Sequence, residues 1–551
     1  MKYLLIACLL VFPAARAADV NSPAERLLDR IVERENSFLE SIRARTPLIE
    51  TYIQETPEAG SGDARPNKDH YFLGRFRLAE TVGYEPLVER TDAAPKSGLR
   101  MLPFHLAAKA QPMSFLPRGF AQMAVIDLHD FNRRTYQFEY VRREFLGEVR
   151  CLVFDVTPVR RTQPGKFVGR MWVEDRDFAI VRFNGTYVPA PASKGSAPER
   201  FFHFDSWRVN AAPDVWVPAQ IYIEEEPAPG DPATPGLPRF KAQSRIWDYA
   251  GSKTSKMDEL TSILIESKSE VKDQSASKDN SPLESQRSWE RQAEENLVDR
   301  LEKGGLIAPP GPVDEVLNTV VNNLIVAGKL NVDAHCRVLL TTPIETFSIG
   351  HTIIISRGLI DVLPDEASLA LMLADELSHI ALGHATQTQF AFHNQTMLSD
   401  AELLQRFRFQ RSPMEMDSAG KKTIEIMRAS PYQKTANAGL FLKALGGRSG
   451  ELPRLLQANL GDQVANADAL ARLAEFAASA PPLEEDKLEQ IAALPLGSRV
   501  KLDPWNNHIT LVKTRPISLL SAREKMPFEV TPFVLYLTRS EDSQSPAASG
   551  K

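Results

Sequence analysis

The chain has 551 residues, a hydrophobic content of 43% and a charged content of 25%, which is the composition of an ordinary globular protein. This length is too great for one hydrophobic core and predicts roughly two or three domains. The formal net charge of −6 is small, and no block is basic enough to bind nucleic acid. A nucleic-acid partner is therefore excluded, and enzymes and binding proteins remain.

The first segment, residues 1–17, has the pattern of a secretory signal peptide. Lys2 supplies the positive charge, residues 3–12 form an apolar run too short to span a bilayer, and residues 15–17 form a small-x-small cleavage site. No later segment reaches about 18 uninterrupted apolar residues, so no transmembrane segment is expected in the mature chain. We therefore expect the mature protein to be periplasmic or secreted.

Residues 18–60 are predicted to be an N-terminal helix and residues 61–250 an antiparallel β-sheet domain. Ser22-Pro23 marks a helix start, and the helical spacing of apolar residues extends over about 22–55. Alternating runs such as "TYQFEYV" and "RCLVFDVTP" follow, with the hairpin "GRMWVEDRDFAIVRF" turning at residues 175–177. These strands predict one curved or half-closed antiparallel sheet that lies on a helix.

The sheet region, about 70–250, loosely resembles the lipoprotein-carrier fold, an unclosed barrel that holds acyl chains. The hairpin "GRMWVEDRDFAIVRF" carries this resemblance. It implies lipid bound at the sheet domain and thus a third possible function, a lipid or lipoprotein carrier. A large apolar cavity lined by Tyr136, Phe138 and Trp172 would favour this function, and a filled sheet would exclude it. The alternative is a sheet packed on its own helix without any ligand, because a fold does not establish a function.

The rest of the chain divides into four predicted segments: a polar linker at 251–290, a mainly helical domain with a small sheet at 291–480, a small β appendix at 481–540 and a disordered tail at 541–551. The predicted fold class is therefore α+β and multidomain, with a curved antiparallel sheet domain first. Cys151 and Cys336 fall in different domains, and we expect both to be buried free thiols.

The segment "LPDEASLALMLADELSHIALGHA", residues 363–385, is predicted to contain a buried helix because apolar residues dominate it. Asp375 and His379 lie four residues apart and share one face, while Glu376 is rotated by about a hundred degrees. Ionisable side chains in an apolar helix are costly unless they are paired or bound to metal. In a zincin helix the residues at i and i+4 bind the metal, and the glutamate after the first is the general base.

Residues of about 306–450 resemble the HtpX-like and CAAX-prenyl-protease-like zinc metallopeptidases (metallopeptidase family 48). The elements "SRGLI", "ELSHIALGH" and "MDSAG" carry the resemblance, in the family's order and spacing. It implies a zincin-like fold, zinc as cofactor and peptide-bond hydrolysis. It also implies that Glu376 is the general base, that His379 is the second metal ligand, and that Asp417 lies just outside the ligands.

The chain departs from this family where the metal would be held. Asp375 replaces the first histidine, and Pro413 replaces the third ligand, a glutamate. The run "SPME" instead predicts a helix start in which Glu415 bonds back to Ser412 in a capping box. An aspartate is shorter than a histidine, so Asp375 reaches the same ion only if the helix or the metal moves. We interpret the zinc site as eroded, with Glu415 or Asp417 as a substitute ligand if zinc is held.

A metal-free alternative pairs Asp375 with His379 by a hydrogen bond across one helical turn. Glu376 is then buried and neutral, or paired with His351 or an arginine. His384 is expected to point about 140° away from His379 on an ideal helix, which excludes it from the site.

Two functions follow from these residues. The first is a non-catalytic or strongly weakened peptidase relative of the cell envelope that binds extended polypeptide clients or envelope proteins. Its binding strand, predicted to be a sheet edge, is formed by Thr352, Ile353, Ile354, Ile355 and Ser356. The second function is an active zinc metalloendopeptidase with a rebuilt Asp375/His379 site and Glu376 as general base.

Overall fold

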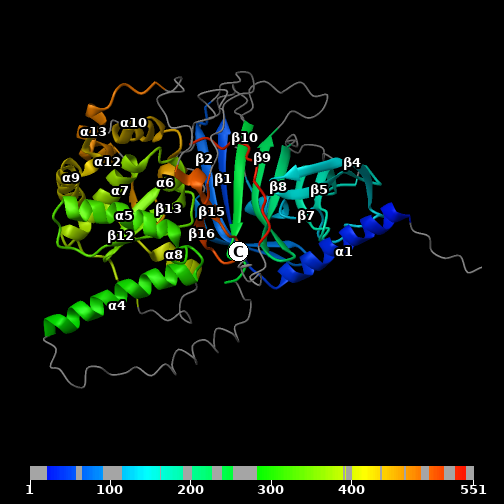
Figure 1. The fold of residues 1–551 in the computed structure, drawn as a ribbon, viewed down its shortest axis with the longest axis horizontal. Helices are drawn as coiled ribbons and strands as arrows, with labels where there is room; N and C mark the ends of the chain where they lie inside the picture. The colour runs from blue at the N-terminus through cyan, green and yellow to red at the C-terminus, as the bar shows by residue number, and fades with distance from the viewer. Residues whose placement is uncertain are drawn as a thin grey trace, which may run out of the picture.

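The computed structural model describes residues 22–56, 65–90, 115–161, 163–189, 202–225, 239–251, 282–388, 391, 400–434, 437–464, 467–484, 496–513 and 528–540. The predicted signal peptide (1–17), nearly all of the predicted linker before residue 282 and the tail at 541–551 lie outside these residues. The described residues have the expected α+β architecture. A long curved sheet lies beside a helical region with smaller sheets (Figure 1).

The large sheet has ten strands in the order β3-β2-β1-β10-β9-β8-β7-β6-β5-β4, and every described neighbour pair is antiparallel. Its strands are β1 (Leu48–Thr56), β2 (Lys68–Leu78), β3 (Val82–Arg90), β4 (Tyr136–Leu146), β5 (Val149–Pro158), β6 (Phe167–Glu174), β7 (Ile180–Tyr187), β8 (Phe202–Ala212), β9 (Val215–Glu225) and β10 (Arg239–Trp247). The predicted hairpin at residues 175–177 is confirmed as the β6–β7 connection.

The N-terminal helix is shorter than predicted. Helix α1 runs from Pro23 to Arg43 and begins with a capping box between Ser22 and Glu25. Residues 48–56, which the helical pattern assigned to the same helix, form β1 in the interior of the large sheet. This prediction was wrong because β1 is hydrogen-bonded to β2 on one side and β10 on the other, and this long-range pairing overrides local propensity.

Both faces of the large sheet are covered. One face packs on α1, on α2 (Pro117–Gln122) and on the segment 115–131 in a single apolar cluster. The opposite face is divided between two partners. Strands β1, β2 and β10 pack on the helical region, and strands β5 to β9 pack on the C-terminal segment 528–540.

The C-terminal segment 528–540 has no helix or strand of its own and crosses the second face of the large sheet. At its start, Val530 donates its backbone N–H to the side chain of Gln54 in β1 at 2.8 Å. Near its end, the Leu537 carbonyl accepts from the Glu148 N–H in the β4–β5 hairpin at 2.9 Å. The segment therefore ties a central strand to the far edge of the sheet.

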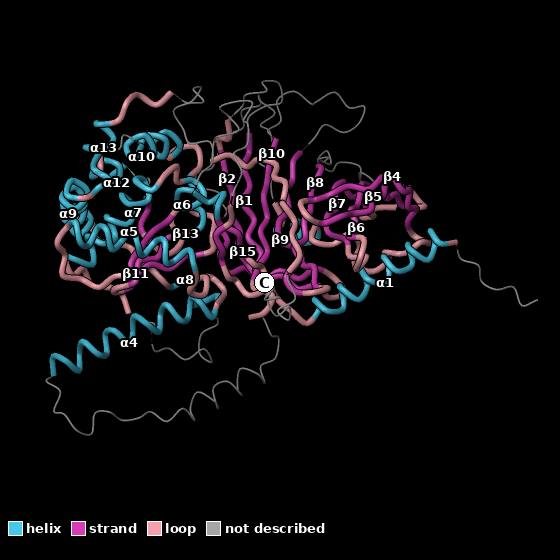
Figure 2. The backbone as a smooth tube through the Cα atoms, in the orientation of Figure 1, coloured by secondary structure: helices cyan, strands magenta, loops and turns pink. Residues whose placement is uncertain are grey.

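The helical region encloses a second sheet (Figure 2). This sheet has four strands in the order β11-β13-β12-β14. The helices of the region are α4 (Pro282–Lys303), α5 (Pro312–Ala327), α6 (Arg357–Val362), α7 (Glu366–Ala381), α8 (Asp400–Arg406), α9 (Pro413–Ala429), α10 (Asn437–Arg448), α11 (Pro453–Leu456), α12 (Ala467–Arg472) and α13 (Ala474–Ser479). Its strands are β11 (His335–Leu339), β12 (Glu345–Ile349), β13 (Thr352–Ser356) and β14 (Asp462–Gln463). In the described part of the predicted appendix, 481–540, the strands are β15 (Val500–Leu502) and β16 (Ile509–Leu511).

Buried polar groups join the large sheet to the helical region. Glu50 of β1 accepts hydrogen bonds from the backbone N–H and the hydroxyl of Thr342, both at 2.6 Å. Asp69 of β2 accepts from two backbone amides of α11 at 2.8 and 2.9 Å. Arg245 of β10 forms an ion pair with Asp361 of α6 at 2.7 Å. These bonds hold the helical region against the sheet in a defined position.

The sequence predicts that both cysteines of the mature chain are buried free thiols and that the mature chain has no transmembrane segment. Cys151 and Cys336 are both free and buried, as predicted. Within the described ranges, no helix combines the length and the apolar character that crossing a bilayer requires.

Candidate functional site

Helix α7 carries the residues that the sequence singled out. It begins after Asp365, whose carboxylate accepts the Ser368 N–H, and it contacts α5, α9, α10 and β12. Most of its residues are buried, which confirms the predicted buried helix. Its ionisable side chains point in different directions.

Asp375 faces α9. Its carboxylate accepts a hydrogen bond from the Thr423 hydroxyl at 3.0 Å, and the Arg472 guanidinium of α12 lies 3.9 Å from its second oxygen. Burial raises the pKa of the Asp375 carboxyl, while Arg472 and Thr423 act in the opposite direction. The predicted bond between Asp375 and His379 is not formed, because residues of α9 and α12 supply a donor and a positive charge instead.

His379 is 1% exposed and contacts His384, with 2.9 Å between their Nδ1 atoms. The prediction that His384 points away was wrong because α7 does not continue to residue 384. Gly383 has a φ of +69°, the His384 N–H donates to the His379 carbonyl, and the Gly383 N–H donates to the Ile380 carbonyl. This is a Schellman helix end, which folds His384 back over the last turn.

The two imidazoles form a neutral pair. The Ser418 hydroxyl donates to the Glu415 carbonyl at 2.9 Å and lies 3.3 Å from His384 Nε2. The network therefore assigns the Nε2 proton to His384 and leaves its Nδ1 to accept from His379. Burial, followed by the positive charge of Arg411, lowers the pKa of His379 to about 3.

Glu376 is 3% exposed and lies close enough to Cys336 of β11 for its charge to act on that thiol. Burial raises the pKa of the Cys336 thiol on β11, and the nearby carboxylates of Asp314 and Glu376 add to this shift. The Nδ1 of His351, the residue expected to pair with Glu376, lies 2.9 Å from the Asp333 carbonyl. Glu376 therefore points away from the partners of Asp375.

The start of α9 is the predicted capping box. Ser412 is the N-cap, Pro413 takes the first helical position, and the Glu415 carboxylate accepts the Ser412 N–H at 2.9 Å. Asp417 is exposed on the next turn. Glu415, offered as a substitute metal ligand, is thus engaged in a helix cap.

Replacing Glu415 with alanine tests this capping role. The Glu415→Ala variant is expected to lose about 1 kcal/mol of unfolding free energy, because one end of the capping box is removed. Urea denaturation measures the loss, and elemental analysis of the same samples is expected to show an unchanged zinc content. A fall in zinc content would instead make Glu415 a ligand.

The strand Thr352–Ser356 is not a sheet edge. It is β13, which pairs in parallel with β11 on one side and antiparallel with β12 on the other, and all of its residues are buried. The prediction was wrong because β11, which lies earlier in the chain, takes the outer position. The main-chain groups of β13 are consequently used within the sheet.

The donors on α7 and α9 do not fit zinc. A structural or catalytic zinc takes three or four deprotonated protein ligands around one point. Asp375, Glu376 and His379 diverge, and the guanidinium groups of Arg411 and Arg472 lower the pKa of His379 and so oppose a further cation. Across the described residues, no group of three or more His, Cys, Asp or Glu side chains could hold a metal ion.

No sequence pattern indicated that Arg411, Arg472 and Thr423 would lie beside Asp375 and His379. Arg472 and Thr423 lie far along the chain from Asp375, and no local pattern connects them. The return of His384 had a readable signal, since a glycine directly after a helical run is typical of a Schellman end.

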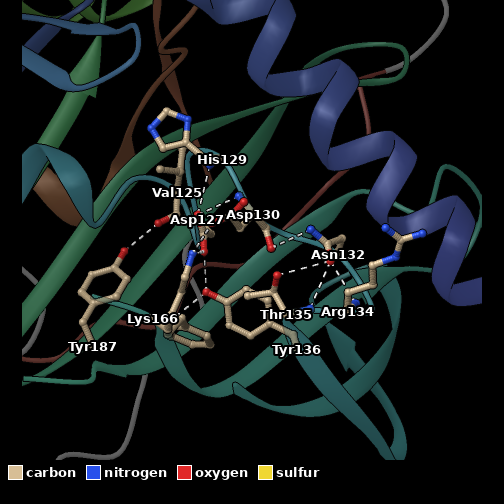
Figure 3. A network of polar contacts seen from close by, with 11 residues as sticks. Val125, Asp127, His129, Asp130, Asn132, Arg134, Thr135, Tyr136, Lys166 and Tyr187 are labelled. Carbon is tan, nitrogen blue, oxygen red and sulfur yellow. Dashed lines mark hydrogen bonds and ion pairs between the residues drawn. The ribbon is translucent and has the colours of Figure 1, made fainter. Parts of the chain in front are cut away.

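A second polar network lies on the large sheet and holds residues 122–136 against it (Figure 3). Lys166 donates to Asp127 at 2.8 Å and to Asp130 at 2.9 Å, and the Tyr136 hydroxyl donates to Asp127 at 2.7 Å. The Tyr187 hydroxyl donates to the Val125 carbonyl at 2.7 Å. These contacts are made within the chain, so the network fixes a loop on the sheet.

The three aromatic residues proposed to line a lipid cavity do not share a face. Tyr136 and Phe138 belong to the apolar cluster under α1, while Trp172 belongs to the cluster under the C-terminal segment. Successive side chains of a strand point to opposite faces, which places Trp172 opposite its neighbours Met171 and Val173. The predicted cavity is therefore not formed by these residues.

Comparisons with known proteins found solved structures of low similarity. No family model and no curated protein matches the sequence. Similar solved structures include a LolA superfamily protein from Nitrosomonas europaea, with 13% identity, a TM-score of 0.20 and coverage of 40% of this chain and 91% of that chain. A DUF1329 family protein from Desulfovibrio piger has 12% identity, a TM-score of 0.20 and coverage of 41% and 92%.

Such low identities and TM-scores carry no inference about function. Neither of these two structures is described as a metallopeptidase, so the resemblance of residues about 306–450 to that family stays a prediction.

Proposed function

We propose that this protein is a metal-free, non-hydrolytic binding protein of the cell envelope that holds extended polypeptide clients in its peptidase-like helical region. One observation carries the proposal: the residues at the would-be metal positions are committed to contacts within the protein. Asp375 is bonded to Thr423, His379 to His384, and the start of α9 is occupied by the Ser412–Glu415 capping box.

Export is part of the proposal and rests on the pattern of residues 1–17. Polypeptide binding rests on the small sheet, because main-chain groups at a sheet edge recognise an extended chain without any catalytic group. A metallopeptidase both binds a polypeptide and hydrolyses it. In this proposal the protein keeps the binding framework, while side-chain contacts within the protein take the place of the hydrolytic centre.

Metal content and peptidase activity test the proposal. The purified mature protein, dialysed against trace zinc, is expected to retain no stoichiometric zinc by elemental analysis. It is also expected to leave unfolded casein intact with or without added zinc. The control is Glu376→Gln, which is expected to behave like the wild type in both assays. Retained zinc together with casein cleavage that Glu376→Gln abolishes would overturn the proposal in favour of an active metalloendopeptidase.

A further inference from the structure

Strand β12 has an outer edge that its neighbour covers only in part. β14 pairs with Glu345 and Thr346 and then ends, so residues 347–349 of β12 extend beyond it. The N–H and C=O of one strand residue point to the same side. The Ser348 carbonyl accepts a hydrogen bond from Arg411, which is not part of the sheet. The main-chain N–H and C=O of Ser348 therefore both point to the outer edge of β12, away from β13.

The chain itself lies over this edge. Arg411 donates to the Ser348 hydroxyl at 3.0 Å and to the Ser348 carbonyl at 3.4 Å. The same guanidinium donates to the Ala385 carbonyl at 2.6 Å and to the His384 carbonyl at 3.4 Å. Gly350, just beyond β12, donates its N–H to the Thr386 hydroxyl at 2.8 Å. Arg411 thus joins His384 and Ala385 to β12, and the Thr386 hydroxyl adds a separate bond to Gly350.

We infer that Arg411 is an autoinhibitory latch, which holds residues 384–386 over the outer edge of β12 and keeps an extended polypeptide from pairing there. The inference rests on the proposed function, because the excluded client is the polypeptide proposed above. Natural sheets commonly cover an exposed edge with a loop. Here Arg411 and the Thr386 hydroxyl join the cover to residues 348–350, so breaking these few bonds would release it locally.

The position of the latch follows from the helix end described above. The Schellman turn at Gly383 sends the chain back toward the small sheet, and the next residues meet Arg411 directly before the α9 capping box. Both ends of the latch are therefore anchored: one by the helix cap of α9 and the other by the His379–His384 contact.

Arg411→Ala in the full mature protein tests the latch. The probe is a short fluorescein-labelled peptide of alternating valine and threonine flanked by lysines, followed by fluorescence anisotropy. The variant is expected to bind the probe at least about tenfold more tightly than the wild type, since it no longer has to displace residues 384–386. Thr386→Val is expected to give a smaller gain in the same direction. Arg408→Ala is the matched control, because Arg408 is an exposed arginine near Arg411 that donates to the carbonyl of its neighbour Phe407.

A further variant locates the binding. Proline at an outward-facing edge position removes a main-chain donor without removing a bond to β13. Ser348→Pro added to Arg411→Ala is therefore expected to abolish the gain. Circular dichroism and urea denaturation confirm that each variant is folded. No gain in folded Arg411→Ala and Thr386→Val, or a gain that survives Ser348→Pro, overturns the latch.

Mass spectrometry of the recovered probe distinguishes a failure of the latch from a failure of the proposed non-hydrolytic function. An intact probe with tighter binding supports both. A cleaved probe overturns the non-hydrolytic proposal, and the latch is then decided by the affinities measured with a zinc chelator present.

Discussion

Lowering the pH from 7 to 5 is expected to destabilise the wild-type protein by about 2 kcal/mol more than the His379→Gln variant. The reason is the buried imidazole, whose pKa is lowered from 6.5 to about 3 by burial and by the charge of Arg411. Between these two values the unfolded chain binds a proton that the folded chain does not. The stabilisation is complete above pH 6.5 and decreases as the pH falls toward 3.

Urea denaturation at the two pH values measures this difference. Glutamine keeps an amide that can contact His384, so the His379→Gln variant retains the packing of the site at pH 7. His508→Gln is the control, because His508 is exposed. Equal acid sensitivity of wild type and His379→Gln would show that His379 protonates freely in the folded protein.

Breaking the buried ion pair between α1 and β8 is expected to cost about 3–5 kcal/mol of unfolding free energy. Glu35 and Arg208 are each 1% exposed, and the guanidinium donates to both carboxylate oxygens at 2.7 Å. Arg208 also lies over the Phe38 ring, 4.1 Å from its centre. Either Glu35→Leu or Arg208→Met alone leaves one charge buried without its counterion.

The double variant Glu35→Leu with Arg208→Met removes both charges and is expected to be more stable than either single variant. Urea denaturation of the three proteins measures the coupling. Glu425→Ala is the control, because it breaks the exposed Lys422–Glu425 pair and should change stability by less than about 0.5 kcal/mol. Additive losses in the double variant would contradict a coupled buried pair.

The features predicted correctly from the sequence are those that depend on neighbouring residues. The Ser412–Glu415 capping box lies within four residues, and the β6–β7 hairpin is specified by its turn and by alternation on either side. The burial of α7 follows from its apolar composition. Each of these depends on a short window, in which propensity and pattern agree.

The features that were missed depend on pairing between distant segments. Residues 48–56 carry a helical pattern, yet β2 and β10 recruit them into the interior of the large sheet. The position of β13 depends on where β11 lies, which the strand itself does not encode. At the candidate site, Asp375 is bonded to Thr423 and faces Arg472, both distant in sequence, so its partners could not be read from the α7 sequence.

The C-terminal segment 528–540 also constrains the order of events during biogenesis. It bonds Gln54 and Glu148, which both lie in the first third of the sequence, and it covers the apolar cluster that contains Trp172. Contacts between such distant residues form slowly because a long loop must close first. Until residues 528–540 have been synthesised and delivered, this part of the sheet is exposed to proteases and to other nascent chains. Protection against degradation is therefore expected to be acquired only once residues 528–540 have docked on the sheet.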